Sequence, residues 1–278
     1  MTEGIDWNEM WRRKVESSSW GNRHESWIEF WDSRAEGYDS RVKSNQGKHI
    51  EVINGLDVGP EDSVLDVGAG PGTLAIPLAR KARLVTAVEP SRGMISCLCR
   101  NAKEANLRNI VPIEKLWEDV RPIQDVSEHD VVVASYSLGM KDIRGALEKM
   151  DLLARKYVYL FHFAGDASAI YRDLWYEVHH EVYRSGPDYI YLANVLHQMG
   201  IYANVDVNSE EQIQRFASLD EAASHWSENL DAPPRAEKAI RDRLSSMLEK
   251  DGDDLVQREM MRRVKIWWRP EGRRSGEI

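Results

Sequence analysis

The sequence predicts an α/β fold, with a doubly wound and mostly parallel sheet covered by helices on both faces. The first observation is that short apolar runs alternate with helix-length amphipathic segments between residues 56 and 163. The second is that the apolar run 64–67 leads directly into a turn with glycines at positions 68, 70 and 72. The third is that the next apolar run ends in Glu89, where such folds place an acidic acceptor for a ribose. Together these features predict a nucleotide-type ligand at the carboxyl edge of the sheet.

Length and composition favour a globular protein over a nucleic-acid or membrane protein. The chain has 278 residues and a formal net charge of −9, whereas a protein that holds nucleic-acid phosphates needs a basic face. The start, MTEGIDWNEM, lacks the positive head and apolar core of a signal peptide, and no apolar run is long enough to cross a bilayer. The two cysteines, Cys97 and Cys99, are too few ligands for a metal site. We therefore expect a soluble cytoplasmic protein without a metal or a membrane contact, and the charge disfavours a nucleic-acid partner.

The central region predicts five strands separated by helices. The strands are expected at 63–67, 84–88, 109–116, 129–137 and 156–163. The helices are expected at roughly 73–82, 91–105 and 142–154, and Thr73 is the predicted N-cap of the first of them. The continuous valine run within 129–137 is typical of a strand that is covered on both faces.

The rest of the chain divides into a cap, two insertions and a tail. Residues 1–55 are predicted to form an N-terminal helical cap, because tryptophans and other aromatic residues recur there at helical spacing. Residues 56–270 are predicted to form the ligand-binding domain, with helical insertions at 164–187 and 208–261. A helix at 189–200 and strands at 201–207 and 262–270 are expected to complete that domain. The polar residues 271–278 are predicted to form a flexible tail.

The spacing of the glycines discriminates between ligands. A dinucleotide fingerprint, G-x-G-x-x-G, requires a glycine or small residue at position 73, where this chain has Thr73. The turn instead reads G-x-G-x-G, and Asp66 stands two residues before its first glycine. A carboxylate there is poorly placed beside a pyrophosphate but suits the cationic amino group of a methionine moiety. The spacing therefore disfavours a nicotinamide-dependent oxidoreductase and favours S-adenosylmethionine as the cofactor.

The turn resembles the first motif of class I S-adenosylmethionine-dependent methyltransferases. The segment FWDSRAEGYDSRV (30–42) is similar to one that precedes the core in many small-molecule members, of the type 11 and ubiquinone-biosynthesis-like group. The run VVVASYSLGM (131–140) resembles their fourth motif, whose strand end lies beside the transferable methyl group. The resemblance implies a Rossmann-like, seven-stranded sheet whose last strand is antiparallel.

The same resemblance implies the residues that hold the cofactor. Glu89 corresponds to the acid that accepts hydrogen bonds from both ribose hydroxyls, and Met94 would form an apolar wall for the adenine. The loop after the third strand would reach the adenine amino group; it holds Trp117, Glu118 and Asp119, either acid could make the contact, and Trp117 could equally be a packing residue. The complete predicted cofactor set is Tyr38, Asp66, Gly68, Ala69, Gly70, Gly72, Glu89, Pro90, Met94, Trp117, Glu118 and Ser135.

Methyl transfer from a sulfonium requires little covalent help from the protein. The methyl group is already activated, so the enzyme mainly aligns the two reactants and excludes water. A general base is needed only when the acceptor loses a proton. By their position at strand ends, Tyr136 and His162 are the candidate catalytic residues, although a satisfied core histidine is the alternative for His162.

The expected function is methyl transfer to a small-molecule acceptor by in-line displacement. The acceptor would lie under an aromatic-rich helical lid formed by residues 164–187 and the N-terminal helices. Three alternatives stay open: a protein methyltransferase, an RNA methyltransferase, and a non-catalytic S-adenosylmethionine-binding protein. The sequence also leaves a homodimer open.

Overall fold

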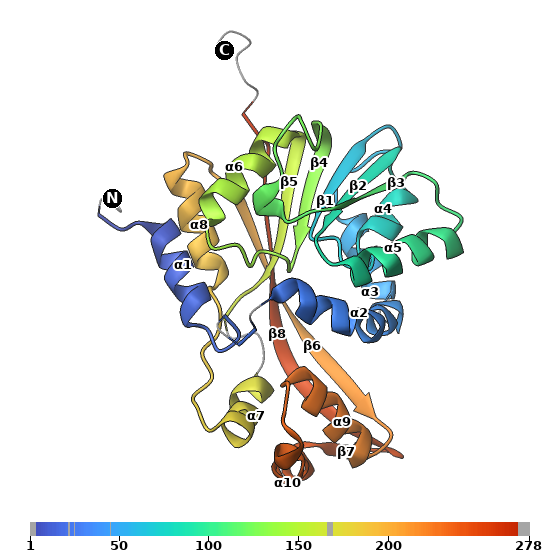
Figure 1. Ribbon diagram of the computed structural model, residues 1–278, viewed down its shortest axis with the longest axis vertical. Coiled ribbons are helices and arrows are strands. Elements are labelled where there is room, and N and C mark those ends of the chain that lie inside the picture. The colour runs from blue at the N-terminus through green and yellow to red at the C-terminus, as the bar shows by residue number, and fades with distance from the viewer. Residues whose placement is uncertain (1–3, 22, 25, 45, 166–168, 272–278) are drawn as a thin grey trace.

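The structure is a computed structural model that describes residues 4–21, 23–24, 26–44, 46–165 and 169–271. Its centre is a mixed sheet with the strand order β3-β2-β1-β4-β5-β8-β6, and β7 pairs with β8 beside this path (Figure 1). The neighbours among β1 to β5 pair in parallel, whereas β8 is antiparallel to both β5 and β6. The expected doubly wound sheet with a reversed last strand is thus confirmed. The strand bounds are β1 Ser63–Val67, β2 Leu84–Glu89, β3 Ile110–Glu114, β4 His129–Ser135, β5 Ala154–Phe163, β6 Asn204–Phe216, β7 Glu249–Asp251 and β8 Asp254–Trp268.

Helices cover both faces of the sheet, which explains why β1 is buried along its whole length. One face packs against α1 (Trp7–Ser17), α6 (Ile143–Leu153) and α8 (Tyr189–Gln198). The other face packs against α3 (Gln46–Asn54), α4 (Ala75–Ala79) and α5 (Arg92–Glu104). In the part of the chain that the structure describes, no helix is both long and apolar enough to cross a bilayer.

The helices of the predicted N-terminal cap, residues 1–55, pack against different parts of the molecule. Trp11 of α1 is fully buried, and its indole nitrogen donates a hydrogen bond to the carbonyl oxygen of Met140 at 2.7 Å. The helix α1 is therefore part of the main core, because its tryptophan fills space between the sheet and its covering helices. The helix α2 (Trp27–Ser44) instead lies below the sheet in Figure 1 and packs mainly against α5.

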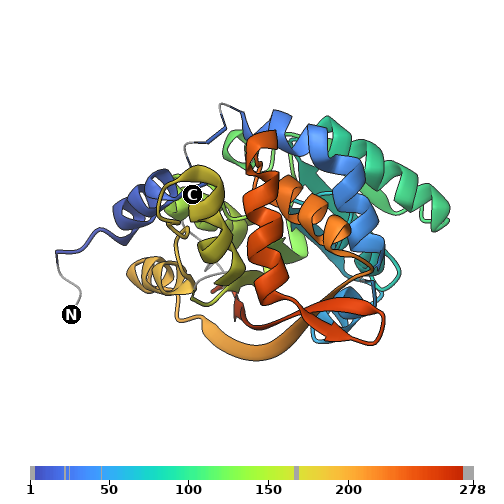
Figure 2. The same ribbon diagram turned by 90° about the horizontal axis from the view of Figure 1, so that it is seen from below.

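A second, smaller group of elements is joined to the sheet by a two-stranded ribbon, which is formed by β6 and β8. The pairing of β5 with β8 stops at Phe163↔Arg263, but β6 and β8 stay paired as far as Phe216↔Leu255. At the far end of this ribbon lie α7 (Ala169–His179), α9 (Leu219–Asn229), α10 (Glu237–Met247) and β7 (Figures 1 and 2). We call these elements, with the far ends of β6 and β8, the lobe. The lobe has an apolar core of its own, which includes Leu174, Trp175, Phe216, Trp226, Ile240 and Leu244.

The lobe differs from the predicted helical insertions, because it contains strands as well as helices. The strand expected at 201–207 runs from Asn204 to Phe216, and the strand expected at 262–270 begins at Asp254. Much of the ribbon is exposed, so its polar sequence carries no apolar alternation. Its charges are paired across the strands instead, as in the contacts of Lys265 with Asp206 and of Arg258 with Glu211.

Two helix predictions were also too long. The helix expected at 73–82 covers only five residues, and Leu74 rather than Thr73 is its N-cap, because the glycine-rich turn continues as far as residue 74. The helix expected at 164–187 ends at His179, because His180 adopts a left-handed backbone with φ of 57°. Residues 166–168 of that segment, and 272–278 of the predicted tail, lie outside the described residues.

Candidate functional site

The glycine turn between β1 and α4 contains three glycines with positive φ, but for different reasons. A Cβ atom on Gly68 would lie 2.3 Å from the Cβ of Ser137, and one on Gly72 would lie 2.7 Å from the Cδ1 of Leu98. A Cβ on Gly70 would meet nothing within 4 Å. Packing therefore requires glycine at positions 68 and 72. Gly70 faces open space, where its bare backbone can approach a ligand.

Glu89, at the end of β2, is joined to this turn. Its Oε2 accepts a hydrogen bond from the backbone nitrogen of Gly70 at 2.9 Å, and its Oε1 accepts one from that of Ser91 at 3.0 Å. The side chain is buried, and burial raises the pKa of its carboxyl group. The predicted ribose acceptor thus lies beside the glycine that faces open space.

Asp66, in β1, is a buried carboxyl group with an unsatisfied atom. The residue is 1% exposed, and its Oδ2 has no hydrogen-bond partner among the described residues. Burial, followed by the nearby charge of Glu89, raises the pKa of Asp66 to about 7. Because an unpartnered buried carboxylate is costly, this atom calls for a cationic or hydrogen-bond-donating ligand. The α-ammonium group of S-adenosylmethionine is such a ligand, so the carboxyl group of Asp66 fits the predicted cofactor.

The helix α2 is fixed to this site by two aspartates that sequence analysis gave no role. Asp32 accepts hydrogen bonds from Ser91 Oγ at 2.5 Å and from the backbone nitrogen of Gly93 at 2.9 Å, which caps the start of α5. Asp39 accepts one from Asn101 Nδ2 at 2.6 Å, and the same amide donates to the carbonyl oxygen of Pro71 in the glycine turn. The seven-residue spacing of Asp32 and Asp39, on one face of a helix, was the available signal.

Two other predicted residues lie where α2 meets α5. Tyr38 is half-buried, hydrogen-bonds Thr73 of the glycine turn, and has its pKa raised by burial. Met94 is 3% exposed and packs with Ala35, Cys97 and Tyr38. Pro90, half-buried, follows Glu89 directly.

The predicted loop after β3 divides into a buried and an exposed residue. The indole of Trp117 is 3% exposed and donates a hydrogen bond to the carbonyl oxygen of Ala146 at 3.2 Å, so it packs in the core beneath α6. Glu118 is exposed beside it. In the glycine turn, Ala69 is likewise a core residue, so only its backbone can serve a ligand.

The two candidate catalytic residues lie on different sides of β5. Tyr136 follows the half-buried Ser135, and its ring centroid is 4.5 Å from that of Phe163. His162 alternates with Phe163 along the strand and packs against Trp11 of α1, with ring centroids 6.1 Å apart. Its Nδ1 lies 3.0 Å from the carbonyl oxygen of Phe163, and burial lowers its pKa. The structure therefore does not bring Tyr136 and His162 together, and His162 has the contacts of a core histidine.

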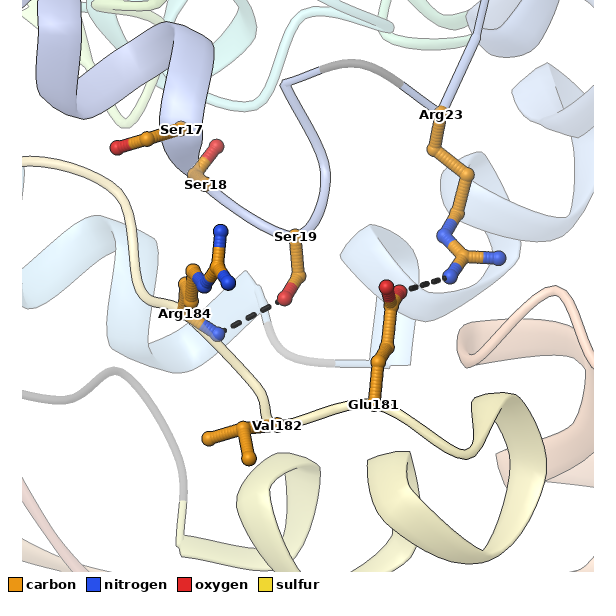
Figure 3. Close-up of a pocket in the computed structure, with 7 residues that line it drawn as sticks. All are labelled: Ser17, Ser18, Ser19, Arg23, Glu181, Val182 and Arg184. Carbon is orange, nitrogen blue, oxygen red and sulfur yellow. Dashed lines mark hydrogen bonds and ion pairs between the residues drawn. The ribbon is translucent and has the colours of Figure 1, made fainter.

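A cavity of about 460 Å³ lies elsewhere, between the end of α1 and the segment after α7 (Figure 3). It is bordered by an ion pair between Arg23 and Glu181 at 2.6 Å and by two hydrogen bonds between Ser19 and Arg184. None of its lining residues belongs to the predicted cofactor set. It is therefore not the cofactor site.

Comparison with known proteins agrees with this geometry. A family model described as a methyltransferase domain matches residues 64–156. An uncharacterized protein of Haemophilus influenzae is 33% identical over 185 residues, which are 63% of this chain and 65% of that protein. The 23S rRNA (uracil(1939)-C(5))-methyltransferase RlmD of Vibrio cholerae is 35% identical over 66 residues, 24% of this chain and 15% of that enzyme. The chain thus spans less than two thirds of either relative.

Among solved structures, the YcgJ protein of Bacillus subtilis has a TM-score of 0.56 at 14% identity, covering 83% of this chain and all of that one. At this identity the similarity shows a shared fold. Residues 64–156 thus match a methyltransferase domain, and the chain has a Rossmann-like fold.

Proposed function

We propose that the protein binds S-adenosylmethionine at the glycine turn and catalyses methyl transfer to a small molecule. The observation that carries this proposal is the buried, unpartnered oxygen of Asp66, which lies within electrostatic range of Glu89, the acceptor of a hydrogen bond from Gly70. Asp66 would hold the ammonium group, and Glu89 would accept hydrogen bonds from the ribose hydroxyls. The cofactor supplies an electrophilic methyl group on a sulfonium centre.

The protein's own contribution would be alignment and exclusion of water. Asp32 and Asp39 hold α2 against α5 and the glycine turn, and this fixes Tyr38 beside Thr73. On the other side of the turn, Ser137 Oγ donates a hydrogen bond to the carbonyl oxygen of Val67 at 2.6 Å. The site would therefore be rigid where the cofactor binds.

A line of aromatic rings supports an apolar or aromatic acceptor. From Trp175 in the lobe, successive centroid distances of 5.1, 6.1, 5.1 and 5.5 Å lead through Trp20, Phe30 and Trp31 to Tyr38. Trp31 remains 37% exposed on this line. We propose that α2 and the lobe cover the acceptor, with α1 excluded from this lid because it belongs to the core.

RNA remains a second candidate acceptor because of the similarity to the rRNA methyltransferase. The net charge of −9 weighs against it. A location in the cytoplasm and a homodimer remain predictions, and the free thiols of Cys97 and Cys99 fit a reducing compartment.

The test is calorimetric titration of the purified protein with S-adenosylmethionine, S-adenosylhomocysteine and NADH. We expect the first two to bind, NADH not to bind, and Glu89→Ala to weaken binding at least tenfold. Glu128→Ala, at an exposed acid just before β4, is the matched control and should leave binding unchanged. Binding of NADH alone would overturn the proposal. A salt-sensitive RNA complex would replace the small-molecule acceptor by RNA.

A further inference from the structure

A row of three polar side chains joins the ribbon to the end of β4. Arg263 of β8 pairs in register with Phe163 of β5. Its Nη1 donates a hydrogen bond to the phenol oxygen of Tyr136 at 3.3 Å, and its Nε lies 2.6 Å from Oε1 of Glu210 on β6. The guanidinium carbon also lies 5.8 Å from the centroid of the Tyr136 ring. Arg263 is thus held between one acidic and one aromatic side chain, and its own side chain is 34% exposed.

Tyr136 has a backbone that is unusual for its residue type. Its φ is 53°, which costs a residue with a Cβ about 1–2 kcal/mol. The conformation is held by a hydrogen bond from the Tyr136 nitrogen to the carbonyl oxygen of Phe161 at 3.0 Å, and by the ring contact with Phe163. Strained residues that the surrounding structure holds in place are concentrated at functional sites. Tyr136 is at such a place, because it follows β4 at the edge that carries the glycine turn.

The chemistry of the pair fixes the direction of the phenol proton. A guanidinium group has donors only, so the phenol oxygen must accept from Arg263. The proton of the phenol then points away from Arg263. Resting on the proposed function, we propose that Arg263, oriented by Glu210, is a positioning residue that makes Tyr136 a hydrogen-bond donor to the methyl acceptor. The acceptor accordingly carries an oxygen or nitrogen lone pair beside its reacting atom.

The electrostatic surroundings agree with a protonated Tyr136 that can donate a hydrogen bond. Burial raises the pKa of Tyr136, while Arg263 acts in the opposite direction and Glu210 in the same direction as burial. Tyr38 of α2 also lies within electrostatic range of Tyr136. Tyr136 therefore keeps its proton at neutral pH. This assigns a more specific role than the general catalytic one expected from the sequence.

The experiment places 3-fluorotyrosine at position 136 and follows its fluorine resonance through a pH titration. With Arg263 present, the guanidinium lowers the pKa of the fluorophenol. We expect Arg263→Gln to raise this pKa and shift the resonance, and Arg263→Lys to restore part of the change. Arg262→Gln is the matched control, because Arg262 is the exposed neighbour on the opposite face of β8. An unchanged resonance and pKa in Arg263→Gln would overturn the proposal.

A second titration tests whether Tyr136 faces the transfer site. Saturation with S-adenosylhomocysteine should shift the resonance of residue 136 in the wild-type background, and Arg263→Gln should bind that ligand as tightly as wild type. If the resonance does not shift when S-adenosylhomocysteine binds, Tyr136 lies outside the site and the inference is overturned. Failure of calorimetric binding in the wild type would instead refute the proposed function, and the pH titration would still decide whether Arg263 acts on Tyr136.

Discussion

Single residues in the glycine turn differ in what they require of their neighbours. The three glycines are equivalent in the sequence motif, and all three have positive φ in the structure. The structure separates them, because a Cβ on Gly68 would overlap Ser137 whereas one on Gly70 would extend into open space. Packing therefore explains the first glycine, whereas the second leaves open space beside the backbone, where we propose that the ligand binds.

Gly70→Ala should separate binding from folding. We expect it to lower the free energy of unfolding by about 1–2 kcal/mol, the cost of a left-handed alanine. Affinity for S-adenosylhomocysteine should fall about tenfold or more, because the methyl group enters the space beside Glu89. Gly68→Ala is the comparison: overpacking against Ser137 adds about 1–3 kcal/mol to its destabilisation. Thermal unfolding and calorimetry measure both quantities, and undiminished affinity in Gly70→Ala would contradict the proposed ligand position.

The raised pKa of Asp66 predicts how stability depends on pH. The folded-state pKa of about 7 exceeds the ordinary value of 3.8, so the unfolded chain releases this proton first as pH rises. Asp66 therefore lowers stability progressively between pH 4 and 7, by about 4 kcal/mol in total. Asp66→Asn should remove this loss, so its stability relative to wild type should increase from pH 5 to pH 7.5. Thermal unfolding at the two pH values checks the sign.

The same residue predicts a pH dependence of binding. An ammonium ligand favours the ionised carboxylate, so affinity for S-adenosylhomocysteine should rise up to about tenfold per pH unit below pH 7 and level off above it. Asp66→Asn should bind weakly at pH 8 and lose this slope. Equal slopes in both proteins would show that another group titrates.

At the scale of elements, the strands and helices of the parallel core could be predicted and the ribbon could not. The strands β1, β2 and β4 are buried apolar runs bounded by turns, so composition alone locates them. The extended part of β6 reads NSEEQIQR and is largely exposed, so no apolar face marks it as a strand. Its structure depends on pairing with β8, about 50 residues later. Local pattern cannot show such a partner.

At the scale of the whole molecule, the ribbon joins the lobe to the sheet, and two polar contacts join the lobe to α2. Arg34 forms an ion pair with Asp231 at 2.9 Å, and Arg41 donates a hydrogen bond to Asn229 at 2.8 Å. Both partners lie at the end of α9 or just after it. Partly exposed contacts of this kind are weak. We therefore expect these two contacts to add modestly to the aromatic contacts of Trp20 with Trp175 and with Phe30, which also join the lobe to α2.

The double variant Arg34→Ala, Arg41→Ala should loosen the lobe without unfolding the core. Hydrogen exchange of the α9 amides should increase about three- to tenfold, while that of β1 and β4 stays unchanged. Arg12→Ala is the control, because Arg12 pairs with Glu9 one turn earlier in the same helix. Unchanged exchange in α9 would mean that its packing against α10 and β6, rather than these arginines, sets its stability.

The sequence by itself determined the parallel core, the glycine turn and the acids Asp66 and Glu89, because each is specified by spacing within a few residues. The tertiary structure alone decided the lobe, the fixing of α2 by Asp32 and Asp39, and the contact of Arg263 with Tyr136. Those two residues are 127 positions apart and meet only because β8 enters the sheet beside β5. Local spacing encodes strands and turns, whereas contacts between distant side chains depend on which strands become neighbours.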